Sequence, residues 1–400
     1  MENRENSLWR PETDVDKDKV VDLLSNLIKI PSFVTDETGV NENKLVDFIE
    51  DWLGKNTKLK VERQALSGGR FNLIAKCGQS ETIFLGHTDT VQPSKDAPVN
   101  QLIGKIIKDE IWGRGATDMK SGVAALMSAA SLARRANNYW IIFYADEEYD
   151  FLGMKAFVKE FGALRPKRIV SADGSDLAIG LGCRGLIELT CRVKGETGHP
   201  AKGTGKNAIW GSISALASLK KYLDNFHNPI MGRTSFNLAY IHGGAELAKS
   251  VGVNNRLEKV GKAGNVVPDV CEFTIDIRPA KPDLDADKVI EFLKNEFKTL
   301  GIDFELVERK HDLGAWYTDK KEIQNFAKVA REVTGENNFA NPRSTGYLDL
   351  QMLWRTAGKP PSFVFGGGIG STAHKPDERI KISDLIKTRN FFLKVMEGLD

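Results

Sequence analysis

The sequence predicts an α/β fold in which helices cover both faces of a mixed sheet, with a second domain inserted into the first. Two observations lead to this prediction. Strand-like and helix-like segments alternate over 1–184 and again over 313–400, which is typical of a largely parallel or mixed sheet. The intervening residues, 185–312, follow a different order of elements.

The first segment, 1–184, alternates between amphipathic helices and short apolar strands. Helices are expected at 15–30 and 40–54. The stretch 121–135 is rich in alanine and apolar on most sides, so we expect a helix buried against the sheet. The expected strands are 58–64, 71–77, 81–87, 139–145 and 167–172.

The middle segment has the order β-α-β-β-α-β, which is the ferredoxin-like split motif. Its expected strands and helices are 185–194, 207–225, 235–242, 267–278, 285–299 and 302–309. The α/β pattern then returns with elements at 319–334, 347–357, 361–366 and 382–398. We therefore predict a discontinuous first domain, 1–184 with 313–400, and an inserted domain, 185–312.

Composition narrows the class of protein. Charged residues make up 28% of the 400 residues and the formal net charge is +2, which favours neither a nucleic-acid nor a membrane partner. No apolar run reaches the roughly 18 residues that cross a bilayer, and the first ten residues lack the apolar core of a signal peptide. The cysteines are scattered without a C-x-x-C pair. We expect reduced thiols in a cytoplasmic protein.

Five segments end in an acid or a histidine where a strand or its turn is expected to end. Functional groups of an open α/β sheet lie beyond the carboxyl ends of its strands. Histidines and carboxylates gathered there are typical of a metal site. The five segments are T-I-F-L-G-His87-T-Asp89, W-G-R-G-A-T-Asp118-M-K, I-I-F-Y-A-D-Glu147-Glu148, R-I-V-S-A-Asp173 and F-V-F-G-G-G-I-G-S-T-A-His374.

His87 is the first candidate ligand. It could be a hydrogen-bonded histidine at a sheet edge, but Asp89 two residues later favours a ligand. A metal-binding histidine usually donates its second ring N–H to a carboxylate, so we predict that Asp89 orients His87. Asp118 has glycines on both sides. It could cap the following helix, or it could bridge two metals.

Glu147 and Glu148 follow a buried strand and another acid. They could form a solvated acidic loop, but clustered acids are costly without a nearby cation. We expect one to bind metal and the other to act as general base. Asp173 and His374, taken singly, could be an Asp-Gly turn residue and a loop histidine. Together with the others they complete the ligands for two adjacent metals.

These segments, in this order, resemble the co-catalytic zinc family that contains acetylornithine deacetylase, succinyl-diaminopimelate desuccinylase, aminoacylase, carnosinase-like dipeptidases and glutamate carboxypeptidase. The resemblance covers nearly the whole chain and implies a zinc-exopeptidase-like sheet with an inserted lid and dimerisation domain. It implies two Zn²⁺ ions, although the ligands also suit Co²⁺ or Mn²⁺. It further implies a cis peptide bond after Asp118.

The resemblance assigns the ligands individually. His87 and Asp173 are expected to bind one zinc, Glu148 and His374 the second, and Asp118 to bridge them. Glu147 is then the general base.

In the inserted domain, the resemblance implies that His199 in G-E-T-G-H-P polarises the scissile carbonyl, frequently in the partner subunit's site. Asn265 and Arg278 match positions that hold the substrate. A surface-loop His199 and an Arg278 paired with a local acid remain open.

A further loop, S-T-G-Y-L-D-L-Q, matches a substrate-binding loop of the family through Gly346 and Asp349. It departs from the family pattern because Tyr347 and Leu348 replace smaller residues and Gln351 stands where arginine is common. His227, His242 and His311 match no ligand position, and we interpret them as structural.

These observations predict metal-assisted hydrolysis of an amide bond. We expect an N-acyl-amino-acid deacylase of deacetylase or desuccinylase type, in which the zincs activate water, Glu147 takes its proton and Arg278 binds the substrate carboxylate. The alternatives are a dipeptidase or carboxypeptidase of the same family and, more remotely, an inactive metal-binding scaffold. A homodimer through the inserted domain is expected. The G-G-G-I-G segment lacks the order of a phosphate-binding loop.

Overall fold

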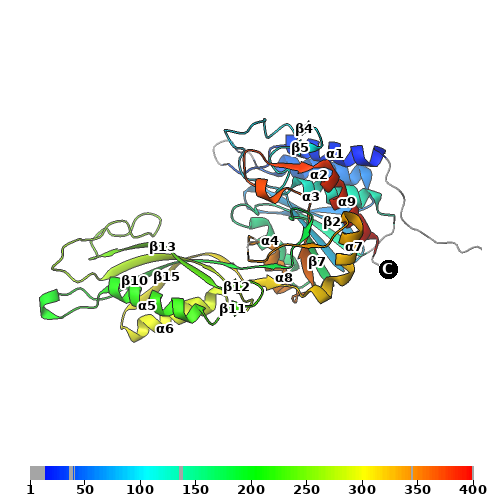
Figure 1. The fold of residues 1–400 in the computed structure, drawn as a ribbon. Helices are drawn as coiled ribbons and strands as arrows, with labels where there is room; N and C mark the ends of the chain where they lie inside the picture. Colours follow the sequence, from blue (N-terminus) through cyan, green and yellow to red (C-terminus); the bar gives the residue numbers. More distant parts are fainter. Residues whose placement is uncertain (1–13, 36–38, 40, 135–137, 344–345, 399–400) are drawn as a thin grey trace, which may run out of the picture. The chain divides into compact units, whose positions relative to one another are not determined.

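The computed structural model of the protein describes residues 14–35, 39, 41–134, 138–343 and 346–398 (Figure 1). The chain forms two compact units. The first contains Met1–Leu181, Thr318–Ala340 and Thr356–Asp400, and the second contains Gly182–Tyr317 and Asn341–Arg355. The domain boundaries predicted from the sequence differ from these units mainly in 341–355, which we assigned to the first domain and which belongs to the second unit.

The first unit is built on a six-stranded mixed sheet, as the sequence predicted. Four neighbouring strands, β6, β3, β7 and β18, are parallel, whereas β2 runs antiparallel to β6 and to the edge strand β1. The strand order is β1 (Lys60–Ala65), β2 (Phe71–Cys77), β6 (Tyr139–Tyr144), β3 (Thr82–His87), β7 (Arg168–Ser171) and β18 (Ser362–Val364).

Helices lie on both faces of this sheet (Figure 1). Arg63 of β1 pairs with Asp47 and Glu50 of α2, whereas the next residue, Gln64, donates to the Ala156 carbonyl of α4. Successive strand residues point to opposite faces, so α2 and α4 cover opposite faces. The helices are α1 (Asp14–Lys29), α2 (Asn43–Asn56), α3 (Lys120–Leu132), α4 (Leu152–Phe161), α7 (Gln324–Thr334) and α9 (Ile382–Glu397).

Helix α3 is the central helix of the first unit. It contacts α1, α9 and β3, and its residues from Lys120 to Ala130 are all buried. Alanine and glycine allow this close packing, because a Cβ on Gly122 would lie 2.3 Å from the Ala172 carbonyl oxygen. The expected buried helix at 121–135 is confirmed, although it ends at Leu132.

Short elements complete the first unit. A small antiparallel sheet, not expected from the sequence, contains β4 (Lys105–Ile107), β5 (Glu110–Trp112) and β19 (Arg379–Lys381). It brings the segment before α3 beside the segment before α9. The strands β8 (Ala178–Ile179) and β17 (Asn338–Phe339) pair in parallel.

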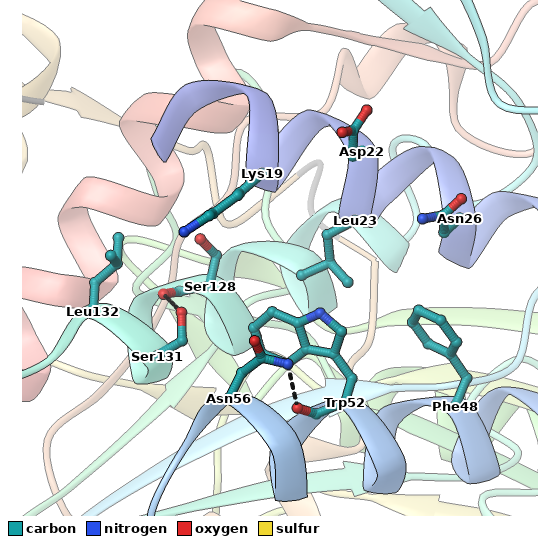
Figure 2. A pocket seen from close by; sticks show the side chains of 10 residues that line it. All are labelled: Lys19, Asp22, Leu23, Asn26, Phe48, Trp52, Asn56, Ser128, Ser131 and Leu132. Atoms are coloured by element: carbon teal, nitrogen blue, oxygen red, sulfur yellow. Dashed lines mark hydrogen bonds between the residues drawn. The ribbon is translucent and has the colours of Figure 1, made fainter. Parts of the chain in front are cut away.

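A groove of about 490 Å³ lies between α1, α2 and the end of α3 (Figure 2). Trp52 and Phe48 of α2 form one side, and Lys19 of α1 and Ser128 of α3 lie opposite. None of its lining residues was a predicted site residue. No helix in the described part of the chain is long and apolar enough to cross a membrane.

The second unit contains a four-stranded antiparallel sheet in the order β13-β14-β10-β15, with two helices. Numbered along the chain, these strands have the spatial order 2-3-1-4, which is that of the ferredoxin-like motif. The elements are β10 (Leu186–Lys194), α5 (Ala208–Leu223), β13 (Ser235–Gly244), β14 (Val270–Arg278), α6 (Ala286–Thr299) and β15 (Asp303–Leu313). Strand β14 begins at Val270 instead of the expected 267.

The two faces of this sheet differ in chemistry. Leu189 and Cys191 of β10 join the core beneath α5 and α6. The alternate residues are polar: Thr190 bonds to Thr274, and Arg192 pairs with the buried Glu272. This alternation is typical of an antiparallel sheet with one face on a core.

The remaining elements of the second unit are short. They are β9 (Gly182–Cys183), β16 (Trp316–Tyr317), β11 (His227–Asn228), β12 (Gly232–Arg233) and α8 (Leu350–Thr356).

The packing of α3 yields a test with a matched control. Gly122→Ala should destabilise the protein by about 1–3 kcal/mol, because the new methyl group would overlap a backbone carbonyl. Gly54→Ala in α2 should stabilise by about 0.4–1 kcal/mol, since Gly54 is exposed and nothing lies near its Cβ position. Urea unfolding measures both, and an unchanged free energy of unfolding for Gly122→Ala would contradict the packing.

Candidate metal centre

The direction of four parallel strands explains where the site forms. Because β3, β6, β7 and β18 are parallel, their carboxyl ends meet at one edge of the sheet. His87 is the last residue of β3, Glu147 and Glu148 follow β6, and Asp173 follows β7. His374 lies in the segment after β18.

Asp118 comes from the connection between two of these strands. Helix α3 joins β3 to the parallel strand β6 and therefore runs back along the sheet, so its amino terminus lies at the same edge. Asp118 lies two residues before the first residue of α3, Lys120. The Asp118–Met119 peptide bond is cis, as the resemblance implied, and the Met119 sulfur accepts the backbone N–H of His87 at 3.1 Å.

The predicted ligands form two groups that share Asp118. His87, Asp118 and Asp173 place ligand atoms within 4.8 Å of one another, and so do Asp118, Glu148 and His374. Asp118 Oδ1 lies 3.0 Å from His87 Nε2, and Asp118 Oδ2 lies 3.1 Å from His374 Nε2. Glu148 Oε1 is also 3.1 Å from His374 Nε2. Each oxygen of Asp118 therefore faces a different histidine.

The electrostatics of these groups favour added positive charge. Burial lowers the pKa of His87, but the hydrogen bond to Asp118 and the charge of Asp89 outweigh it and hold that pKa well above its usual value. Hydrogen bonds to Asp118 and Glu148 raise the pKa of His374 to about 10. Burial opposes ionisation of Asp118, yet its two histidine partners hold its pKa below the usual value.

The donor set fits two divalent cations. Neutral imidazole and carboxylate are ligands that Zn²⁺ prefers, and they also suit Co²⁺ and Mn²⁺. Two cations would replace the protons that the crowded carboxylates otherwise draw onto the histidines. Glu147 belongs to neither group. It is buried, and it directly precedes Glu148, a predicted ligand, in the sequence.

Asp89 contacts His87 through its backbone carbonyl, whereas we expected its carboxylate to orient the histidine. The Nδ1 atom of His87 lies 3.0 Å from the Asp89 backbone carbonyl and 3.6 Å from its carboxylate, so the carbonyl is the closer acceptor. The two carboxylate oxygens instead accept the backbone N–H groups of Glu147 and Glu148, each at 3.0 Å. Asp89 therefore fixes both the histidine and the acidic turn.

Sequence reasoning gave no role to the residues that hold this turn from the other side. Asp146 has a left-handed backbone, with φ of 71°. Its carboxylate accepts the N–H groups of Asp150 and Leu152 and pairs with Arg70 at 2.7 Å. Arg70 also pairs with the buried Glu42 at 2.8 Å. In the sequence, the only sign of this role was that Asp146 adds an acid directly before the Glu147–Glu148 pair in A-D-E-E.

A second set of residues without a predicted role lies beside Asp118. Glu378 is buried, follows His374 by four positions and accepts the backbone N–H of Asp118 at 3.1 Å. It pairs with the buried Arg114. The signal was present in H-K-P-D-E and W-G-R-G, but pairing between residues so distant in sequence is decided by the fold.

The remaining predicted residues, His199, Asn265, Arg278 and Gly346, belong to the second unit. His199 and Asn265 are exposed. Their loops are joined by a hydrogen bond from the Val267 N–H to the Gly198 carbonyl at 2.9 Å. Gly346 is also exposed, in the segment before α8.

Arg278 has a local acidic partner. Its Nε and Nη2 atoms each lie 2.9 Å from an oxygen of Asp276. Its guanidinium carbon lies 5.6 Å from the ring centre of Tyr347. The structure thus contains the ion pair that we left open as an alternative, and it adds an aromatic contact.

Gln351, which stands where the resemblance led us to expect arginine, forms hydrogen bonds with the backbone. Its Oε1 accepts the Leu348 N–H at 3.0 Å, and its Nε2 donates to the Gly314 carbonyl at 2.5 Å. The side chain is buried. Gln351 therefore ties the loop that contains Leu348 to the backbone at Gly314. It does not carry the positive charge that an arginine would have at this position.

The three histidines interpreted as structural also lie in the second unit. His227 is in β11, His242 in β13 and His311 in β15. The two ligand groups found among the described residues include none of them.

Comparisons with known proteins show the family and the fold of this chain. Residues 83–398 match Peptidase family M20/M25/M40. A curated acetylornithine deacetylase from Aliivibrio salmonicida is 27% identical over 378 residues, covering 88% of this chain and 90% of that protein.

Two solved structures have the same fold. An M20 family metallo-carboxypeptidase from Sulfolobus solfataricus gives a TM-score of 0.69 at 16% identity, covering 97% of this chain and 99% of the other. A dinuclear metal binding peptidase of the M20 family from Bacillus subtilis gives 0.63 at 14% identity, covering 96% and 98%. The family match spans most of the chain, and the chain belongs to peptidase family M20/M25/M40, whose members are metal-dependent hydrolases of amide or peptide bonds.

Proposed function

We propose that this protein is a two-metal amidohydrolase that releases the acyl group from an N-acyl amino acid. The observation that carries the proposal is the placement of Asp118, whose two oxygens lie 3.0 and 3.1 Å from the imidazoles of two different histidines. A carboxylate shared in this way can hold two cations side by side. The likeness to an acetylornithine deacetylase supports the choice of an N-acyl amino acid.

His87 and Asp173 would hold the first cation, Glu148 and His374 the second, and Asp118 both. Two divalent cations supply Lewis acidity, which makes water a stronger acid and polarises a carbonyl. Zinc is our proposed ion, and the dinuclear peptidase of similar fold supports a pair.

Glu147 is the proposed general base. Its N–H is held by Asp89, while its carboxylate stands outside both ligand groups. It would accept the proton of the attacking water and pass it to the leaving amine, so one carboxyl serves as base and then as acid. Its largely buried position limits competition from bulk water.

We assign substrate contacts to the second unit, as a lid. His199 would donate a hydrogen bond to the oxyanion, and Arg278 would bind the substrate carboxylate. Asn265 and Gly346 are the other proposed substrate contacts. Asp276 and Tyr347 hold the guanidinium in place, and Nη1 is not used in the pair with Asp276.

We also propose a cytoplasmic homodimer formed through the second unit. The outer strand of its sheet, β13, exposes Leu238, Tyr240 and Ile241. An apolar edge strand is a surface on which a second sheet can dock. All four cysteines are free, as in a reducing compartment.

Hydrolysis of a mixed substrate panel by zinc-loaded protein tests the proposed function. The panel contains N-acetyl, N-succinyl and N-carbamoyl amino acids and unblocked dipeptides, read by mass spectrometry. We expect loss of one acylated class, and none after a chelator removes the metal. Hydrolysis of dipeptides alone would show that the protein is an exopeptidase and not a deacylase. The similar fold of the metallo-carboxypeptidase favours this alternative. No turnover of any member would favour the inactive scaffold.

The base role predicts a separation of activity from metal binding. Glu147→Ala should lower kcat by about 10²–10⁴-fold, the usual contribution of a general base, while the protein still binds about two metals. Metal content by atomic emission, beside steady-state kinetics, measures both. Glu148→Ala is the matched control and should lose a metal. Loss of a metal from Glu147→Ala would move the base role to another residue.

The lid role of His199 predicts a kinetic signature. His199→Ala should lower kcat by about 10²–10³-fold, as for removal of an oxyanion donor, with a much smaller change in KM.

Light scattering during gel filtration should show a dimer for both the wild type and this variant. A wild-type kcat for His199→Ala would leave His199 as a surface-loop residue, and a monomeric wild type would exclude the dimer.

A further inference from the structure

One buried carboxylate lies at the junction of the two loops that carry the metal ligands. Glu378 follows His374 in the segment before α9, and Asp118 lies in the segment before α3. A single oxygen of Glu378, Oε1, accepts three backbone N–H groups, from Gly115 and Thr117 at 3.0 Å and from Asp118 at 3.1 Å.

Its second oxygen pairs with Arg114, which comes from the same turn as Asp118. Both side chains are buried, with Glu378 and Arg114 each 1% exposed. Arg114 also donates to Ser94 Oγ at 3.2 Å. The carboxylate therefore binds the turn 113–118 through both of its oxygens.

The side chains of Thr117 and Gln101 add hydrogen bonds to the segment of His374. Thr117 Oγ1 donates to the Arg379 carbonyl at 2.9 Å. The Gln101 amide donates to the carbonyls of Lys375 and Pro376, at 2.9 and 3.1 Å. The Thr117 bond joins the segment of Asp118 directly to the segment of His374. Gln101 precedes β4 and links the two segments indirectly, because its carbonyl accepts the Arg114 N–H at 2.8 Å.

The consequence is geometric. His87 and Asp173 are placed by the ends of β3 and β7, which the sheet holds. Asp118 and His374 instead lie in irregular segments, and their 3.1 Å approach depends on how those segments are joined. In Glu378→Gln the amide oxygen can still accept the three N–H groups, but the amide NH2 group would face the buried Arg114 guanidinium, which loses its acceptor. Two donors facing each other in a buried site distort the turn.

We propose that Glu378 is a positioning residue that sets the spacing between Asp118 and His374. Its loss should therefore weaken the cation position formed by Asp118, Glu148 and His374 more than the one formed by His87, Asp118 and Asp173. Two of three ligands depend on the joined segments in the former, and one of three in the latter. This inference rests on the proposed function for its two cation positions.

Glu272 provides the matched control. It is a fully buried carboxylate in the second unit that binds Arg192 and Arg256 and accepts the N–H of Leu257 at 3.1 Å. Glu272→Gln likewise replaces a buried carboxyl group that pairs with arginine, but in the unit that contains none of the predicted metal ligands. A purely structural effect should therefore appear in both variants.

The experiment is a Co²⁺ titration of the metal-free protein, followed by visible absorption and calorimetry. Wild-type protein should bind two Co²⁺ ions. Glu378→Gln should keep the first with nearly unchanged affinity and weaken the second by about 10–100-fold, the usual effect of losing a residue that orients ligands. Its kcat should fall by a similar factor with KM within about threefold. Glu272→Gln should match wild type in both affinities.

The outcomes separate the two ideas. Wild-type affinities for both ions in folded Glu378→Gln, or an equal loss in Glu272→Gln, would overturn the positioning role alone. Two bound ions in wild type with no hydrolysis of the substrate panel would overturn the proposed function alone, and a single ion would overturn both. If Glu378→Gln does not fold, Glu378→Asp replaces it. That variant keeps the charge but withdraws the oxygens by one methylene, and it should weaken the second ion less.

Discussion

The first unit depends on how buried carboxylates are satisfied. Asp89, Asp146 and Glu378 each accept at least two backbone N–H groups from the turns that hold the metal ligands. Such hydrogen bonds favour the ionised form and fix the turn at the same time, although burial raises the pKa of Glu378 to about 7. A ligand set of this density could not stay together on loops alone, because its own carboxylates repel one another. The backbone supplies part of the compensating positive potential, Arg70 and Arg114 supply more, and the metals are expected to supply the remainder.

Strand direction is the second constraint. Four parallel strands deliver His87, the Glu147–Glu148 pair, Asp173 and the His374 segment to one edge of the sheet. Helix α3 adds Asp118 there because it returns between two parallel strands. The small and apolar residues of α3 let it lie close to the sheet, so the same packing that forms the core also places Asp118, the proposed bridging ligand. Stability and ligand geometry therefore share one set of contacts in this unit.

The elements and most of the site could be predicted from periodicity and from the resemblance. Helix α9 and the six strands of the central sheet lie within a few residues of their expected positions, since each has a strong local pattern. The β4-β5-β19 sheet was missed because its strands are three residues long and carry too few residues to show a period. The partner of Arg278 was left open, since an acid two positions away can face the same side of a strand without pairing.

The fold class, the ferredoxin-like order of the middle segment and the candidate ligands can all be predicted from the amino-acid sequence. They follow from local hydrophobic period and from residue types at strand ends, which neighbouring residues specify. Three features depend on how distant segments pack: Asp118 faces two histidines, Asp89 binds the acidic turn through its carboxylate, and Glu378 joins the segments of Asp118 and His374. Glu378 lies 260 positions from Asp118, and no local pattern encodes which buried N–H groups a distant carboxylate will accept.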